Sequence, residues 1–501
     1  MMHPADDAGF TRRTRLLRWT RNVAAGGAIA MVAFLLGVGL VTRTFPDLEK
    51  PQTVQLHSEL HAGPTAPDDF KGYLALEDRL FAELKSKVYH TLPDATQIFD
   101  RYVTGSPSDP ARWKIDWDRS RVVIPASHRG AALLLHGLSD SPYSLRTVGD
   151  LYLEHGFAVV WLRLPGHGTV PSALTRVRWK DWVTATELAM QRATTLAGND
   201  PLHVIGYSNG GLLALDATLH RLEEPGSRVP DRVVLLSPAI GIPGIARFAR
   251  WVKLINWLPP FRKAQWQEVH QEIDPYKYSS FPFNASYQCW VGTQRVQNLL
   301  MKIRKQKKLR RMPSVLAFQS VADATVVATA VKNRLFDLLP ANGSELVLFD
   351  VNRKRSLRRF FSPKVGTLSP WNLDQNDRTY TIDLVTNRSP DTLEVVERIQ
   401  EPGQGTSRVE ETGLSWPEHV YSLSHVAVPF PPDDPIYGDG TAPGADPALP
   451  LGSLELKGES GQLQIPQSLL YRLRYNPFFG VVRRHIEKII GDGPSTADAP
   501  R

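Results

Sequence analysis

From Arg121 onward, the chain alternates between short apolar runs and stretches with helical periodicity. The runs VVIP, AALLLHG, FAVVWLRL, LHVIGYS, RVVLLSPAI, SVLAFQS and ELVLFDV predict strands. Helices are predicted after Ser141, around 179–196, from Asn209 and over 325–339. Nearly continuous apolar runs are typical of parallel strands that are covered on both faces. The pattern therefore predicts an α/β fold with a mostly parallel sheet flanked by helices.

Two longer segments interrupt this alternation. The first, about 241–312, is basic, helical and aromatic, and we expect it to form a cap over an apolar pocket. Its large aromatic residues are Trp251, Trp257, Phe261, Trp266, Phe281, Phe283, Tyr287 and Trp290. The alternative is that these side chains only attach the insertion to the sheet, since large aromatic residues are mostly buried. The second segment, about 352–424, contains the strand-like TYTIDLV and a Gly-rich EPGQGTS turn, and its pattern indicates no function.

An uncharged apolar segment, residues 23–42, lies near the N-terminus. It is long enough to cross the roughly 30 Å hydrocarbon core of a membrane as a helix. Five arginines precede it, at positions 12, 13, 15, 18 and 21. By the positive-inside rule they place the N-terminus in the cytoplasm and the folded body outside it, in the periplasm of a Gram-negative cell. A cleaved signal peptide is the alternative, but the run is long for one and no small-x-small site closes it.

These features predict a domain organisation around one large folded unit. The unit spans 70–490, from an amphipathic helix over Phe70–Leu92 to a basic amphipathic helix near Ser468–Ile490. The remaining segments are a basic cytoplasmic N-terminus (1–22), a single-pass transmembrane helix (23–42), a Pro-rich linker (43–69) and a flexible tail (491–501).

Charge and cysteine content narrow the range of partners. The formal net charge is +8, but the basic residues gather near 12–21, 302–311 and 353–359. Such local patches favour contact with an anionic surface, such as membrane lipid headgroups, over nucleic acid. The run MKIRKQKKLRR is interpreted as a solvated helix face. Cys289 is the single cysteine, which excludes an intrachain disulfide and a cysteine-built zinc site.

The clearest chemical motif is Gly206-Tyr207-Ser208-Asn209-Gly210, which matches G-x-S-x-G. It lies between a predicted strand and a predicted helix, where a nucleophile elbow belongs. Small residues on either side of the serine allow the backbone to close in a sharp turn that lifts the hydroxyl toward a substrate. The motif therefore predicts Ser208 as a nucleophile.

A serine hydroxyl needs a general base, and the base needs a group to orient it. In this class the acid and the histidine follow the serine in that order. Asp323, just after SVLAFQS, is the predicted acid, and Asp350 is the alternative. His425, in the loop SLSHVAVPFP, is the predicted base, and His419 competes with it.

A tetrahedral intermediate also needs two backbone N–H donors. One comes from the residue after the serine and the other from the loop after the first core strand, which predicts Asn209 and Leu138. His136 and His167 lie at positions that do not suit the order of the triad. We interpret them as hydrogen-bonded supports of their loops.

Three motifs together, LLLHGLSDSPYSLR, RLPGHGTVPSAL followed by WKDWV, and GYSNGG, resemble bacterial carboxylesterases and monoacylglycerol lipases of the serine aminopeptidase S33-like (hydrolase-4) group. The resemblance covers roughly 121–339 and the His425 loop. It implies an α/β-hydrolase fold with a cap, activity on acyl esters, no metal or organic cofactor, and Ser208, Asp323 and His425 as the triad. Asn209 departs from the pattern, since relatives often have Met there.

The sequence therefore predicts a membrane-anchored serine hydrolase that cleaves small acyl esters, such as acylglycerols or lysophospholipids, through an acyl-enzyme on Ser208. A serine peptidase of the same fold is one alternative. A non-catalytic binding or scaffold protein is another, and a complete set of serine, acid and histidine argues against it. We expect no nucleic-acid partner, and the oligomeric state is not predicted.

Overall fold

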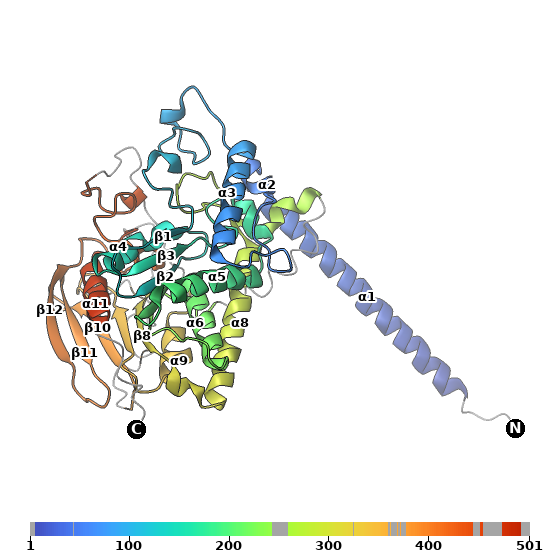
Figure 1. Ribbon diagram of the computed structural model, residues 1–501. Coiled ribbons are helices and arrows are strands. Elements are labelled where there is room, and N and C mark those ends of the chain that lie inside the picture. Colours follow the sequence, from blue (N-terminus) through green and yellow to red (C-terminus); the bar gives the residue numbers. More distant parts are fainter. Residues whose placement is uncertain are drawn as a thin grey trace.

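The computed structural model describes residues 6–43, 45–242, 259–323, 325–358, 361, 368, 371, 377–443, 451–453 and 473–491. In these residues a ten-stranded sheet forms the centre of the protein (Figure 1). Its spatial order is β1 (Arg121–Val123), β3 (Ala158–Leu162), β2 (Ala131–Leu135), β4 (Leu202–Tyr207), β5 (Arg232–Leu236), β8 (Ser314–Ser320), β9 (Glu345–Phe349), β10 (Thr381–Asn387), β11 (Glu394–Gln400) and β12 (Arg408–Ser415). The strands from β3 to β10 run parallel to one another, whereas β1, β11 and β12 are antiparallel to their neighbours.

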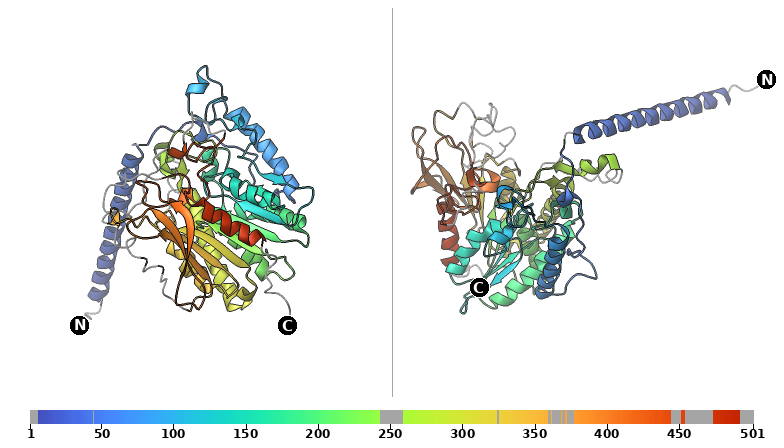
Figure 2. Two further views of the ribbon diagram at one scale, coloured as in Figure 1. Left: turned by 90° about the vertical axis from the view of Figure 1, so that its left-hand side faces the viewer. Right: turned by 90° about the horizontal axis from the view of Figure 1, so that it is seen from above.

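Helices cover both faces of the sheet, as the views in Figure 2 show. One face packs against α3 (Phe70–Lys87), α5 (Trp179–Ala197), α6 (Asn209–Glu223), α8 (Phe283–Lys305) and α9 (Thr329–Arg334). The other face packs against α4 (Arg146–Glu154) and α11 (Phe479–Gly491). In β2, Leu133 and Leu135 contribute to the first core and Leu134 to the second. This two-sided burial explains why the strands are continuous apolar runs.

The predicted α/β-hydrolase fold is confirmed, with a mostly parallel sheet and flanking helices. Three predicted helices are shorter than expected. The helix predicted over Phe70–Leu92 ends at Lys87. The pattern over 325–339 forms only α9 and a single 3-10 turn at Phe336–Leu338. Near the C-terminus α11 begins at Phe479, just after Pro477, because proline is accepted at the start of a helix but not in its interior. Residues 468–472 of that prediction lie outside the described residues.

The segment predicted as a second insertion contributes three strands to the same sheet. TYTIDLV forms most of β10, which pairs in parallel with β9. The Gly-rich EPGQGTS forms the turn between the antiparallel strands β11 and β12. The segment thereby widens the sheet, and it leads back through residues 416–424 to the loop that contains His425.

The first insertion follows β5, and its residues 243–258 lie outside the described residues. Its described part contains a 3-10 helix, Pro259–Gln265, and a small antiparallel pair, β6 (Trp266–Glu268) and β7 (Phe281–Pro282). The long helix α8 follows and packs against α6. The C-terminal part of α8 therefore belongs to the body of the protein rather than to a separate cap.

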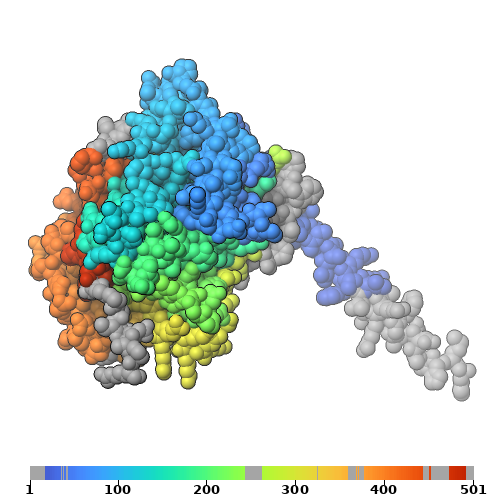
Figure 3. Space-filling view, in the orientation of Figure 1, coloured from blue at the N-terminus to red at the C-terminus, as the bar shows by residue number. Residues whose placement is uncertain are grey.

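The N-terminal helix α1 (Asp6–Thr42) projects away from the body (Figures 1 and 3). Several of its apolar side chains are exposed, among them Trp19, Ile29 and Phe34. The short helix α2 (Lys50–Thr53) then leads onto the body. Among the residues whose structure is described, no helix combines the length and the apolar character that a membrane span requires. The predicted transmembrane helix over 23–42 is therefore not supported.

A buried arginine fastens the segment before α3 to the sheet. Arg163, just after β3, is fully buried, and its guanidinium contacts two carboxylates. Nε lies 2.6 Å from Glu77 in α3, and Nη2 lies 3.0 Å from Glu59 in the preceding loop. Burial raises the pKa of Glu77, and the positive charge of Arg163 opposes that rise. The cluster is stable only while all three charges are paired, because an unpaired buried charge is costly.

Candidate active site

Ser208 lies in the sharp turn between β4 and α6. Its backbone has φ 52° and ψ −113°, a conformation that non-glycine residues rarely adopt. Such strain is maintained only where the surrounding structure enforces it. Here the Ser208 N–H donates to Leu236 O (2.9 Å), and its carbonyl accepts from the Ala239 N–H (3.0 Å). The turn therefore holds the serine where the predicted elbow requires it.

Two glycines of the motif are required by close packing of the backbone. A Cβ atom on Gly210 would lie 1.9 Å from the carbonyl oxygen of Leu135 in β2. A Cβ atom on Gly206 would lie 2.4 Å from the carbonyl oxygen of Gly210. Any side chain at these two positions would push α6 away from the strands. The G-x-S-x-G spacing is thus a consequence of how tightly the helix follows the strand.

The structure brings Ser208, His425 and Asp323 into one hydrogen-bonded chain. Nε2 of His425 lies 3.0 Å from Oγ of Ser208, and Nδ1 of His425 lies 2.7 Å from Oδ2 of Asp323. All three residues are less than one-tenth exposed. Ser208 follows β4, Asp323 follows β8, and His425 begins a short 3-10 turn, His425–Ala427. Residues far apart in the sequence therefore meet at the carboxyl ends of the parallel strands, where α/β sheets carry their sites.

The position of Asp323 is fixed by donors on both of its oxygens. The backbone N–H groups of Thr325 and Val326 donate to Oδ1 (3.0 and 3.1 Å), and Gln319 Nε2 donates to Oδ2 (2.9 Å). Gln319 was not singled out from the sequence, because a glutamine in an apolar run resembles any other strand residue. Its place four residues before the acid, at the end of β8, is the signal that could have identified it.

The two alternatives named from the sequence lie elsewhere. His419 is exposed, and it forms no part of the hydrogen-bonded chain. Asp350 is buried but is held by Arg353, whose Nη2 lies 2.6 Å and whose Nε lies 2.8 Å from its oxygens, and by the Thr386 hydroxyl at 2.7 Å. Asp350 therefore anchors β9 to β10 and does not orient His425.

The two predicted N–H donors flank the serine. Leu138 lies in the loop after β2 and lines the cavity that contains Ser208, and Asn209 is the first residue of α6. Within the described residues, neither backbone amide donates a hydrogen bond. Because the first turn of a helix leaves its N–H groups without partners, the amide of Asn209 is available to an oxyanion.

The Asn209 side chain is fully buried, and neither its Oδ1 nor its Nδ2 has a hydrogen-bond partner in the described structure. An unsatisfied buried amide costs roughly 1 to 3 kcal/mol. We expect Asn209→Leu, whose side chain has the same branching and number of heavy atoms, to raise the free energy of unfolding by up to that amount. Urea unfolding monitored by circular dichroism measures the change. A lower stability in Asn209→Leu would contradict this expectation. Labelling of Ser208 should persist, since only the backbone N–H of residue 209 is used.

A cavity of about 680 Å³ opens onto the serine. Its lining is mainly apolar and includes Leu138, Tyr207, Ala239, Ile242, Phe281, Phe283, Cys289, Val326 and Val426. Polar residues of the lining include Asp140 and Lys277, which form an ion pair at the cavity wall. A mostly apolar cavity with a few placed polar groups is the usual form of a small-molecule site.

The aromatic residues predicted to form a lid occupy different environments. Phe281 and Phe283 line the cavity, whereas Trp266 is buried away from it. Tyr287 and Trp290 stack on each other, with ring centroids 6.0 Å apart. Trp251 and Trp257 lie outside the described residues, as does the side chain of Phe261.

Two histidines and the cysteine near the site are buried and do not belong to the hydrogen-bonded chain. The Nε2 atom of His136 accepts from the Leu164 N–H (2.9 Å), and the Nδ1 atom of His167 contacts Pro165 O (3.1 Å). Burial lowers the pKa of both imidazoles, that of His167 to about 3. They are therefore neutral loop supports, as interpreted from the sequence. Burial likewise raises the pKa of the Cys289 thiol to about 12, so the cavity contains no thiolate from this residue at neutral pH.

The fold and the site together define an α/β-hydrolase of the serine-hydrolase type. Residues 126–350 match the family model described as Serine aminopeptidase, S33 (Hydrolase_4). The resemblance inferred from the motifs is thus confirmed: this part of the chain is similar to the hydrolase-4 group.

A curated relative and several solved structures are similar to this chain. The thermostable monoacylglycerol lipase of Bacillus sp. (strain H-257) is 33% identical over 118 residues, which are 23% of this chain and 42% of the relative. The chain therefore spans about two fifths of the length of that relative. A Paleococcus ferrophilus monoacylglycerol lipase structure is 19% identical, covers 46% of this chain and 87% of its own, and has a TM-score of 0.34. A structure of Est1E from Butyrivibrio proteoclasticus with bound ferulic acid is also 19% identical, covers 46% and 84%, and has a TM-score of 0.33.

Proposed function

We propose that the protein hydrolyses carboxylic esters through an acyl-enzyme on Ser208. The observation that carries this proposal is the hydrogen-bonded chain from Ser208 through His425 to Asp323, at the base of an apolar cavity. A binding or scaffold protein has no need of a strained serine with a base at 3.0 Å. The arrangement therefore favours catalysis over a purely structural role.

In the proposed reaction, Nε2 of His425 takes the proton of the serine hydroxyl while Oγ attacks the ester carbonyl. Asp323 keeps the proton on Nδ1, so that Nε2 faces the serine with its lone pair, and it stabilises the imidazolium that forms. The amides of Leu138 and Asn209 donate to the oxyanion. His425 then gives its proton to the leaving alcohol, and water releases the acid by the same steps in reverse.

The substrate class follows from the shape and lining of the cavity. A volume of about 680 Å³ lined by Phe281, Phe283 and aliphatic side chains accommodates an acyl chain. The named activity of the Bacillus relative, a monoacylglycerol lipase, is consistent with this class. We therefore propose acylglycerols, lysophospholipids or similar acyl esters as substrates.

Fluorophosphonate labelling with p-nitrophenyl ester hydrolysis tests the proposal. We expect the wild type to be labelled and to turn over esters, and Ser208→Ala to lose both properties. Ser227→Ala, which changes a partly exposed serine outside the cavity, is the control and should keep both. Equal labelling of Ser208→Ala and wild type would refute Ser208 as the nucleophile. Because the matching family model is described as an aminopeptidase, aminoacyl p-nitroanilides belong in the same assay, and cleavage of these amides rather than the esters would favour a peptidase.

Contact with membrane lipid stays a prediction, as does a location outside the cytoplasm. The exposed apolar side chains of α1, including Trp19, Ile29 and Phe34, support lipid contact. We expect the full chain to float with phosphatidylcholine vesicles in a density gradient, and a chain lacking residues 1–42 to remain at the bottom. Equal behaviour of the two chains would contradict a lipid contact through α1.

A further inference from the structure

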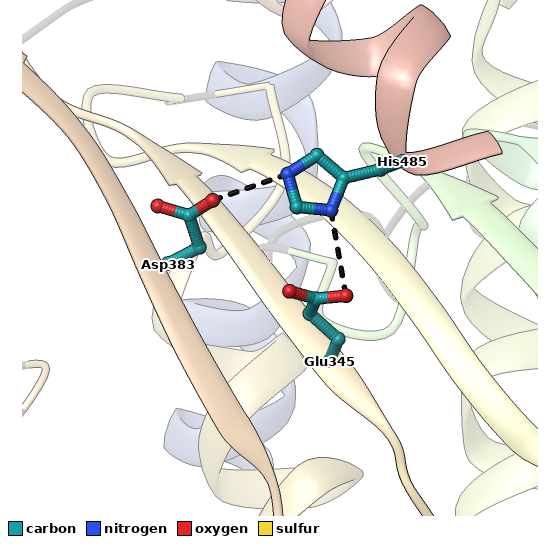
Figure 4. Close-up of side chains that lie close together, drawn as sticks. All are labelled: Glu345, Asp383 and His485. Atoms are coloured by element: carbon teal, nitrogen blue, oxygen red, sulfur yellow. Dashed lines mark ion pairs between the residues drawn. The ribbon is translucent and has the colours of Figure 1, made fainter. Parts of the chain in front are cut away.

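A cluster of ionisable side chains lies on the part of the sheet that the C-terminal helix covers (Figure 4). Glu345 begins β9, Asp383 is in β10 and Glu397 is in β11. Side chains alternate between the faces of a strand, and the register places Asp383 opposite Val347 and Glu397 opposite Val385. Since both valines belong to the core beneath α11, the three carboxylates point toward the same helix.

His485 of α11 inserts among these carboxylates. Its Nε2 lies 3.1 Å from Oδ2 of Asp383 and 3.0 Å from Oε1 of Glu397. On the other side of the ring, Nδ1 lies 3.4 Å from Oε2 of Glu345. Asp383 is fully buried, and the side chains of Glu397 and His485 are 3% and 9% exposed. One imidazole therefore contacts three acidic groups at once.

The cluster gathers three carboxylates around one imidazole. Glu397 also pairs with Arg484, and the positive charge of Lys488 acts on Glu345. One oxygen of Asp383 is ion-paired with His485, and the other has no hydrogen-bond partner in the described structure. A buried carboxylate without hydrogen bonds is costly. A cation bound beside the unpartnered oxygen of Asp383 would reduce that cost.

We propose that this cluster binds one divalent transition-metal ion, such as Zn²⁺, through Nε2 of His485 and the carboxylates of Asp383 and Glu397. Imidazole nitrogen with carboxylate oxygen is a donor set that such ions accept. With bonds of about 2.0–2.1 Å, tetrahedral geometry separates the ligand atoms by about 3.3 Å. The contacts of 3.0 and 3.1 Å from Nε2 need only a slight expansion to reach that separation. Glu345 orients the ring from Nδ1, as carboxylates do behind metal-bound histidines.

The surroundings give the ion access and suggest its role. A cavity of about 530 Å³ adjoins the cluster and is lined in part by Glu345, Glu397 and His485. It leaves room for a water as a fourth ligand. Glu345 is the first residue of its strand, whereas Ser208 and Asp323 follow the last residues of theirs. The cluster therefore lies toward the amino ends of the parallel strands, away from Ser208. The ion would therefore fasten α11 to β10 and β11 and take no part in ester cleavage.

Zinc binding by the full chain tests the proposal independently of the hydrolase activity. The purified protein is stripped with a chelator and titrated with ZnCl₂ alone, with calorimetry and the thermal unfolding midpoint as readouts. We expect one equivalent to bind and to raise the midpoint in the wild type and in His220→Gln, a control that removes a partly exposed histidine next to Asp216. Asp383→Asn and His485→Gln should each bind at least about tenfold more weakly.

Two outcomes would overturn the metal site: no zinc uptake by the wild type, or the same affinity in Asp383→Asn and His485→Gln as in the wild type. If circular dichroism shows that either variant is unfolded, Glu397→Gln tests the same site. Unchanged zinc affinity in Glu397→Gln would likewise overturn the proposal. Loss of zinc binding with ester hydrolysis intact distinguishes this proposal from the one on Ser208.

Discussion

Replacing His425 by alanine is expected to lower kcat for p-nitrophenyl ester hydrolysis by a factor on the order of 10⁴ to 10⁶. The side chain lies 3.0 Å from Oγ of Ser208 and 2.7 Å from Asp323. Without it the serine has no base, and a neutral hydroxyl is a poor nucleophile. Steady-state kinetics of the variant beside the wild type measure the loss, which should fall mainly on kcat because the apolar cavity still binds the acyl chain.

His419→Ala is the matched control for this experiment. His419 lies six positions earlier in the same connection, but it is exposed and forms no part of the hydrogen-bonded chain. Its replacement should leave kcat unchanged. Comparable losses in both variants would mean that the segment, rather than the imidazole of His425, supports the activity.

Arg163→Ala is expected to lower the free energy of unfolding by about 3 to 5 kcal/mol. The change leaves Glu59 and Glu77 buried without the guanidinium that lies 3.0 and 2.6 Å from them. Urea unfolding at pH 8 measures the loss. Arg355→Ala, which removes an exposed arginine paired with Asp391, is the control and should leave the unfolding midpoint nearly unchanged.

The loss of stability in Arg163→Ala should also depend on pH. Burial raises the pKa of Glu77, and in the variant no arginine opposes that rise. A carboxyl with a raised pKa in the folded state stabilises that state below its unfolded pKa, and this stabilisation is lost as the pH rises through the folded value. The difference in stability between variant and wild type should therefore be larger at pH 8 than near pH 5. A difference that is constant over this range would contradict uncompensated carboxylates as its cause.

The sheet and the sharp turn at Ser208 can be predicted from the sequence because both depend on local patterns. Continuous apolar runs reflect burial on both faces, and Gly206 and Gly210 mark a turn that permits no Cβ. The ion pairs of Arg163 and of His485 were not predicted. Their partners come from segments that only the folded chain brings together, and no spacing in the sequence predicts them.

The second insertion shows a different limit. Its strand-like TYTIDLV was recognised, but the pattern of one strand does not reveal which edge it will join. Parallel pairing with β9 depends on β9 offering a free edge, which is a property of the assembled sheet. The order of Ser208, Asp323 and His425 along the chain nevertheless allows their meeting to be predicted without knowledge of the intervening strands.

The distance along the chain between the groups of the site has a consequence for biosynthesis. His425 follows Ser208 by 217 positions, and β5 through β12 lie between them. A chain still emerging from the ribosome can form the elbow around Ser208 long before the imidazole has been translated. Nascent and prematurely terminated chains therefore carry Ser208 without His425. The hydrogen bond between the two side chains can form only in molecules whose synthesis has proceeded past β12.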